Sequence, residues 1–170
     1  MKISTRQLAL CAVLTALALG LSTLENLFPV TLVIPLPGVK LGLANIVTVF
    51  ALYQLGPLPA LCILAARCLL GSLFAGNASA LLFSLLGGTL AMLVMLALSR
   101  LPGLSVYGVS IGGAAAHNIG QMAAALITLG NTAVLGYLPF LLAVSLFTGA
   151  LTGFVSALLL RAMSHVKLSH

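Results

Sequence analysis

The chain has 170 residues, of which 62% are hydrophobic and only 5% are charged, and its mean hydropathy is +1.28. Soluble domains carry about 25% charged residues, so this composition excludes a soluble globular protein and predicts an integral membrane protein. Seven Lys and Arg residues stand against one acidic residue, giving a formal net charge of +6. Because the basic residues are scattered, the charge argues against nucleic-acid binding and favours a bias set by membrane topology.

The three cysteines, Cys11, Cys62 and Cys68, all lie inside apolar runs. Their number is odd, and no CxxC or Cys/His spacing of the kind that binds metals surrounds them. We therefore interpret them as small apolar residues of membrane-spanning helices. We expect neither a metal site nor a bound cofactor.

Apolar runs separated by Gly and Pro predict an all-α integral membrane protein with about six transmembrane helices in a single domain, residues 1–170. A helix that crosses a membrane needs about 20 apolar residues. The first run follows a basic start, as in a signal peptide, but we expect it to remain in place as the first helix. The predicted spans are residues 8–28, 41–56, 58–76, 80–99, 107–130 and 137–162, of which the second is short.

The basic residues predict how the six helices are oriented. With six spans both termini lie on one side, and Lys2, Arg6, Arg100, Arg161 and Lys167 all fall on that side. Loops on the opposite side carry only Lys40. The positive-inside rule therefore predicts a multi-pass protein of the cell membrane with both termini in the cytoplasm.

Small residues recur at four-residue spacing in two of the predicted helices. The first helix carries Ala12, Ala16 and Gly20, and the last carries Gly149 and Gly153. Such a stripe lets helix backbones approach closely. The pattern fits either packing within the bundle or docking of a partner membrane protein, and the spacing alone does not decide between them.

Ionisable residues within membrane spans indicate function by default, because burying a charge in lipid is costly. Arg67 lies about halfway along the third predicted helix, too far from either end to reach water easily. We therefore expect it to be paired or to face a ligand. Glu25, the only carboxylate, is the natural counter-charge for Lys40 or Arg67, and both a structural salt bridge and a ligand contact remain open for it.

The stretch "AAAHNIGQMAAA" concentrates three hydrogen-bonding side chains, His117, Asn118 and Gln121, at spacings that share one helix face. The small alanines around them leave room for a ligand. Asn77 and Ser79, in the turn after the third predicted helix, fit a helix cap as well as a ligand contact.

Together, these residues predict a pocket that opens to the outer side. The residues expected to bind substrate are Glu25, Lys40, Asn45, Arg67, His117, Asn118 and Gln121. The Pro-rich segment "PVTLVIPLPGVK", residues 29–40, is expected to fold over the pocket as a lid. Surplus positive charge in a low-dielectric site favours a small, partly anionic and partly apolar ligand.

Three blocks, "PGVKLGLANIVTVFALYQLG", "RCLLGSLFAGNASALLFSLLGG" and "GGAAAHNIGQ", resemble the Gx transporter family, which is also described as heptaprenyl diphosphate synthase component I. The resemblance covers nearly the whole chain. That family is similar to the substrate-binding S components of energy-coupling factor (ECF) transporters, which are six-helix proteins with a lidded outer pocket. The residues that match are Lys40, Leu41, Gly42, Asn45, Arg67, Gly71, His117, Asn118, Gly120 and Gln121.

The resemblance implies partners as well as a site. In S components an alanine-xxx-alanine stripe on the first helix docks a transmembrane coupling subunit driven by two ATPases, and Ala12 and Ala16 match that stripe. The expected partners are thus a small-molecule substrate of the vitamin, cofactor or quinone-precursor kind, the coupling and ATPase subunits, and membrane lipid.

The synthase description does not predict catalysis by this chain. Prenyl diphosphate synthases bind Mg²⁺-diphosphate through clustered aspartates, because hard cations prefer carboxylate oxygens. This chain contains a single acidic residue, a glutamate, and we expect it not to be an enzyme. The alternative to a transport subunit is a non-catalytic membrane partner of an isoprenoid or quinone biosynthesis enzyme.

Overall fold

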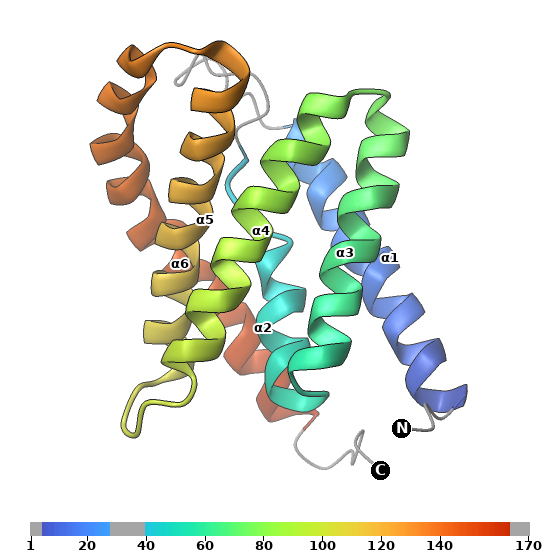
Figure 1. Cartoon of the computed structure of the whole chain (residues 1–170). Coiled ribbons are helices and arrows are strands. Elements are labelled where there is room, and N and C mark those ends of the chain that lie inside the picture. The colour runs from blue at the N-terminus through green and yellow to red at the C-terminus, as the bar shows by residue number, and fades with distance from the viewer. Residues whose placement is uncertain (1–4, 28–39, 164–170) are drawn as a thin grey trace.

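A computed structural model describes residues 5–27 and 40–163 of the chain. This part is helical, and it contains no strand (Figure 1). Its elements are α1 (Thr5–Leu27), α2 (Asn45–Gln54), α3 (Pro57–Ala75), α4 (Ala78–Leu98), α5 (Val106–Leu129), the short 3-10 helix η2 (Thr132–Tyr137) and α6 (Leu138–Ala162). The predicted lid lies outside the described residues, apart from Lys40.

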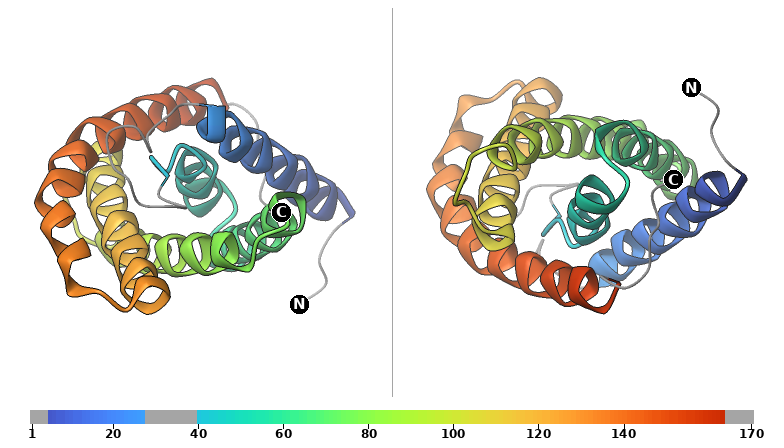
Figure 2. Two further views of the ribbon diagram at one scale, coloured as in Figure 1. Left: turned by 90° about the horizontal axis from the view of Figure 1, so that it is seen from above. Right: turned by 90° about the horizontal axis from the view of Figure 1, so that it is seen from below.

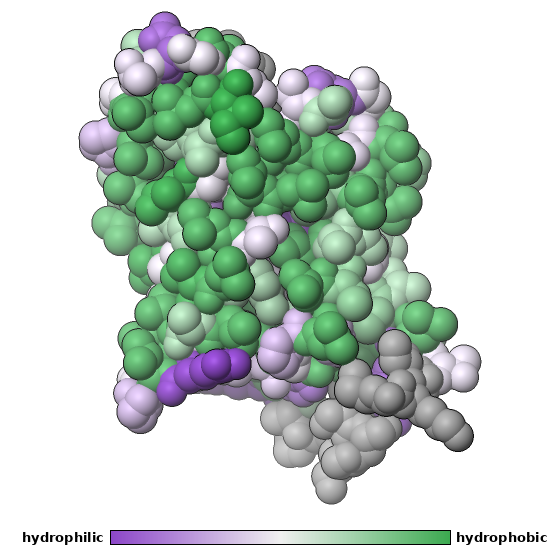
Figure 3. All heavy atoms as spheres, viewed as in Figure 1, coloured by the Kyte–Doolittle hydropathy of each residue, from purple (hydrophilic) through white to green (hydrophobic). Residues whose placement is uncertain are grey.

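Four helical segments of the described chain are long and apolar enough to cross a membrane: Thr5–Glu25, Pro57–Ala75, Ala78–Leu98 and Thr132–Ala162. Figure 3 shows hydrophobic residues across the middle of one face and hydrophilic residues gathered toward its ends. Helix α5 has 24 residues and carries His117, Asn118 and Gln121 along its length. The prediction of an all-α membrane protein is confirmed.

The long helices surround α2, which lies at the centre of the bundle when seen from either end (Figure 2). Helix α5 packs along both α4 and α6, and α1 packs against α3 and α2. The start of α1, the end of α6 and the α2–α3 and α4–α5 turns lie at one end of the bundle, here called the terminal end (Figure 1). Arg6, Arg100 and Arg161 all lie there, in agreement with the predicted charge asymmetry, while Lys2 and Lys167 lie outside the described residues.

The second predicted span, residues 41–56, is wrong in its length. Helix α2 has ten residues, which cover about 15 Å of a hydrocarbon core about 30 Å thick. The preceding residues 40–44 are not helical, because Gly42 adopts φ +86° and there interrupts the helix. Irregular backbone at membrane depth is tolerated only where protein buries it, and in this segment Gly42 and Ala44 are buried and the other residues are partly buried.

The two small-residue stripes have different surroundings. A Cβ atom on Gly149 would lie 2.5 Å from the Cα of Ile111, so this stripe lets α6 press against α5. Ala12, Ala16 and Gly20 are exposed on α1, and a Cβ on Gly20 would meet nothing within 4 Å. The α1 stripe therefore faces outward from the bundle.

Candidate functional site

Six of the seven predicted substrate-binding residues come together inside the bundle. They lie on α1, α2, α3, α5 and the non-helical segment 40–44, and we call them the polar cluster: Glu25, Lys40, Asn45, Arg67, His117 and Gln121. All are buried except Lys40, which is half-buried. Polar side chains within a membrane gather in this way because lipid offers them no partners.

Segment 40–44 is held from two sides by side chains of the cluster. The backbone N–H of Lys40 donates to Oε1 of Gln121 at 3.2 Å, and the backbone N–H of Leu43 donates to the carboxylate of Glu25. These side chains replace the helical hydrogen bonds that the segment lacks. Lys40 therefore lies in the connection between α1 and α2, as predicted, and its backbone reaches the side chain of Gln121 on α5.

His117 and Gln121 form one unit, and the contact with Lys40 fixes its orientation. Because Oε1 of Gln121 accepts from Lys40, the Nε2 amide group of Gln121 must donate to Nε2 of His117, 3.0 Å away. A ring whose Nε2 accepts a hydrogen bond is a neutral imidazole with its proton on Nδ1. His117 can therefore donate a further hydrogen bond from Nδ1.

Arg67 enters the cluster from α3. Its Nη2 atom donates to Oδ1 of Asn45 at 3.4 Å, and its side chain is only 7% exposed. The Nζ atom of Lys40 donates to Oγ of Ser22, 3.1 Å away, a residue that the sequence analysis did not single out. Among the described residues, Glu25 makes no direct ion pair with Lys40 or Arg67, and its carboxylate instead accepts a hydrogen bond from the backbone.

The cluster carries surplus positive charge and surplus donors. Arg67 and Lys40 bring two cations against the single carboxylate of Glu25. Five buried polar side-chain atoms of the described chain make no hydrogen bond, and three of them are donors of the cluster: Nδ2 of Asn45, Nε of Arg67 and Nδ1 of His117. Buried donors without acceptors are costly, so the arrangement suits an acceptor-rich, negatively charged group.

Two glycines of α4 that the sequence analysis did not single out leave space for side chains of the cluster. A Cβ on Gly87 would lie 2.9 Å from Cε1 of His117, and one on Gly88 would lie 3.3 Å from Nη2 of Arg67. Each glycine costs a helix about 1 kcal/mol relative to alanine. An adjacent pair in the middle of an apolar helix was therefore a signal in the sequence.

Asn118, the seventh predicted residue, is directed elsewhere. Its Nδ2 atom donates to the backbone carbonyl of Leu141 at 2.8 Å and so ties α5 to α6. Asn77 caps the start of α4, because its Oδ1 accepts from the backbone N–H of Ser79 at 2.8 Å. No group of three or more His, Cys, Asp or Glu side chains in residues 5–27 and 40–163 is placed to hold a metal ion.

Comparison with known proteins identifies one family. A family model described as heptaprenyl diphosphate synthase component I matches residues 14–159, which include every member of the polar cluster and nearly all of the six α-helices. No curated protein and no solved structure matches the chain.

Proposed function

The chain belongs to the heptaprenyl diphosphate synthase component I family, and on that premise we propose that it is the substrate-binding membrane subunit of an ECF-type importer. One observation carries this proposal: a buried polar cluster with surplus positive charge contains three donor atoms that make no hydrogen bond within the described chain. A cluster that only stabilised the bundle would be expected to satisfy its own donors.

The cluster indicates the class of substrate. The guanidinium of Arg67 can hold a carboxylate or phosphate at two points, which the ammonium of a lysine cannot do. Nδ1 of His117 and Nδ2 of Asn45 add two donors for carbonyl or acid oxygens. Apolar side chains dominate the helices around the cluster. These features favour a small amphipathic anion of the vitamin, cofactor or quinone-precursor kind.

The exposed α1 stripe supports a partner in the membrane. Ala12, Ala16 and Gly20 lie on the outer surface, where small residues allow another helix to approach closely. We assign this face to a transmembrane coupling subunit, with ATPase subunits acting through it.

A second candidate is a non-catalytic membrane partner of an isoprenoid biosynthesis enzyme, and the family description favours it. In both cases the chain itself performs no catalysis. A prenyl diphosphate synthase holds Mg²⁺ through several carboxylates, whereas this chain has one, and Glu25 already accepts a backbone hydrogen bond.

Native mass spectrometry of the purified protein tests the binding role. We expect a retained small molecule in the wild-type protein, its loss in Arg67→Ala and poor recovery in Arg67→Lys. Loss of charge-assisted hydrogen bonds costs about 2–3 kcal/mol, which corresponds to a weakening of roughly 30- to 150-fold. Arg100→Ala, an exposed arginine at the terminal end, is the matched control and should retain the molecule.

Equal retention by the wild-type protein and Arg67→Ala would reject the proposed site. Co-purification separates the two candidates, because an importer subunit should capture a coupling subunit with its ATPases. Capture of a prenyl diphosphate synthase catalytic subunit instead would favour the second candidate.

A further inference from the structure

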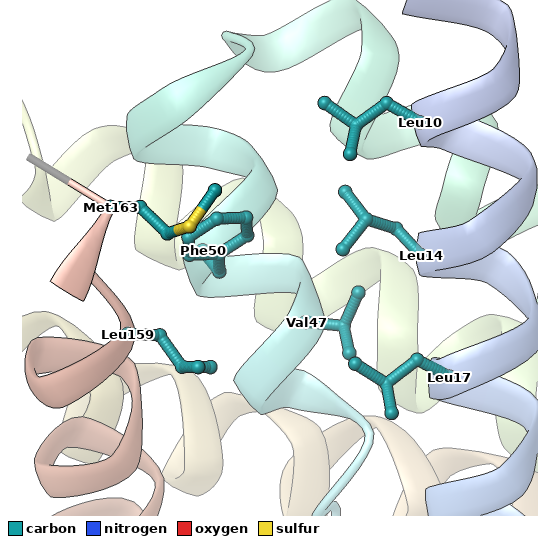
Figure 4. Close-up of a pocket in the computed structure, with 7 residues that line it drawn as sticks. All are labelled: Leu10, Leu14, Leu17, Val47, Phe50, Leu159 and Met163. Atoms are coloured by element: carbon teal, nitrogen blue, oxygen red, sulfur yellow. The ribbon is translucent and has the colours of Figure 1, made fainter. Parts of the chain in front are cut away.

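A cavity lies away from the polar cluster, between α1, α2 and α6 (Figure 4). It encloses about 170 Å³. Its walls are Leu10, Leu14 and Leu17 of α1, Val47 and Phe50 of α2, and Leu159 of α6 with Met163 just beyond it. We call it the α1–α2–α6 crevice. All the side chains that line the crevice are apolar.

The apolar lining decides what can fill the crevice. A cavity of about 150 Å³ lined by leucine, isoleucine and phenylalanine stays dry and accepts apolar guests. The leucines of α1 recur at spacings of four and three, so they form one continuous face along about 10 Å of the helix. The guest that fits this shape is a short length of hydrocarbon chain.

The crevice communicates with the membrane. Among the described residues, α1 packs against α3 and α2 but not against α6, which leaves the side between α1 and α6 open. Leu17 is 49% exposed and Leu159 is 36% exposed at its edges, whereas Phe50 on its floor is 5% exposed. Hydrocarbon can therefore enter from the bilayer and reach α2.

Positive charge lies at the terminal end of the crevice. Arg6 precedes Leu10 by four residues and shares its helix face, whereas Arg161 in the last turn of α6 is two positions from both Leu159 and Met163 and so lies on the other face of that helix. Both arginines are exposed. Basic residues at a membrane surface attract anionic lipid headgroups, and Arg6 stands where the headgroup of a lipid in the crevice would lie.

We propose that the α1–α2–α6 crevice binds one acyl chain of an anionic membrane phospholipid, with the lipid phosphate beside Arg6. A transmembrane helix of a protein partner, about 10 Å wide, is too thick to enter. The site shares no residue with the polar cluster, and the proposal does not depend on the proposed function.

The chain contains no tryptophan, so a single introduced tryptophan reports on the crevice without background. The test places Phe50→Trp in vesicles that contain brominated phosphatidylglycerol or brominated phosphatidylcholine at equal mole fraction, since bromine quenches a tryptophan that it touches. Phe83→Trp, at a side chain 2% exposed, is the buried control, and Phe147→Trp, 79% exposed, is the bulk-lipid control.

We expect both brominated lipids to quench Phe50→Trp more than Phe83→Trp, with phosphatidylglycerol about twofold stronger than phosphatidylcholine. Phe147→Trp should not distinguish the two lipids, and adding Arg6→Gln to Phe50→Trp should abolish the preference. Leu17→Trp, at the exposed edge, provides the same readout at a position where a larger side chain has room.

Two results would overturn the proposal. If quenching of Phe50→Trp and Leu17→Trp does not exceed that of Phe83→Trp, no lipid chain occupies the crevice, and this includes the case in which a neighbouring protein covers it. If Phe50→Trp responds equally to both headgroups, the assignment of an anionic lipid is wrong.

Discussion

Helices α1 and α6 carry small residues at the same spacing and place them in opposite surroundings. On α6, Gly149 and Gly153 meet the backbone of α5, and a Cβ on either would lie within 3 Å of a Cα atom. On α1, the corresponding face is exposed. The contrast shows that small residues at four-residue spacing allow another helix to pack closely. The spacing alone does not say whether that helix belongs to the same bundle, as on α6, or would come from another protein, as the exposed face of α1 permits.

The largest effect is expected from Gly149→Ala. The new Cβ would lie 2.5 Å from the Cα of Ile111 and 3.1 Å from the carbonyl oxygen of Ser110, so α5 and α6 must separate. Overpacking against backbone costs about 2–3 kcal/mol, which a thermal unfolding experiment in detergent would measure.

The same change on the other stripe, Gly20→Ala, is the control for Gly149→Ala. Open space surrounds this glycine, and alanine favours a helix by about 1 kcal/mol, so Gly20→Ala should leave the protein as stable as before or more stable. If Gly20→Ala destabilises the protein as much as Gly149→Ala, the two stripes do not differ in the way described.

An intermediate effect is expected from Asn118→Ala, which removes a hydrogen bond between α5 and α6. Interhelical hydrogen bonds in membranes contribute about 0.6 kcal/mol on average and up to about 1.7 kcal/mol. The 2.8 Å bond to the carbonyl of Leu141 is buried, so we expect a loss of about 1 kcal/mol in the same unfolding experiment. No change in stability would mean that glycine packing alone joins α5 to α6.

The smallest effect on stability is expected from Ala16→Leu. The side chain is exposed on α1, and substitutions on such surfaces usually change stability by less than about 0.5 kcal/mol. The added bulk should nevertheless hold a docked helix away, and co-purification with a coupling subunit should fall about tenfold. Unchanged co-purification would remove the α1 stripe from the docking role.

The helices could be predicted because membrane burial demands long apolar runs, and Gly and Pro interrupt those runs at the turns. The length of α2 could not be predicted from this pattern. Residues 41–56 are apolar almost throughout, and the backbone of Gly42 departs from a helix only because segment 40–44 is held by Glu25 and Gln121. Contacts between distant parts of the chain decide that boundary, and a local pattern does not contain them.

Membership of the polar cluster was predictable for a related reason. Polar side chains in a membrane have few places to go, so Arg67, His117 and Gln121 were expected to converge. The hydrogen-bond partners of single polar side chains could not be predicted. Glu25, for example, accepts from the backbone N–H of Leu43, and Asn118 donates to the backbone carbonyl of Leu141. A backbone group leaves no mark in the sequence that would identify it as a partner.

During synthesis α2 cannot enter the membrane as an independent span, because ten residues are too few to cross it. Helices α1 and α3 are long and apolar enough to insert, and they pack directly against each other. Helix α2 also packs against α6, so α2 is surrounded only once α6, which follows the other described helices in the sequence, has joined them. Enclosure of α2 is therefore completed only after translation has passed α6, whereas every residue of the polar cluster precedes α6 in the chain.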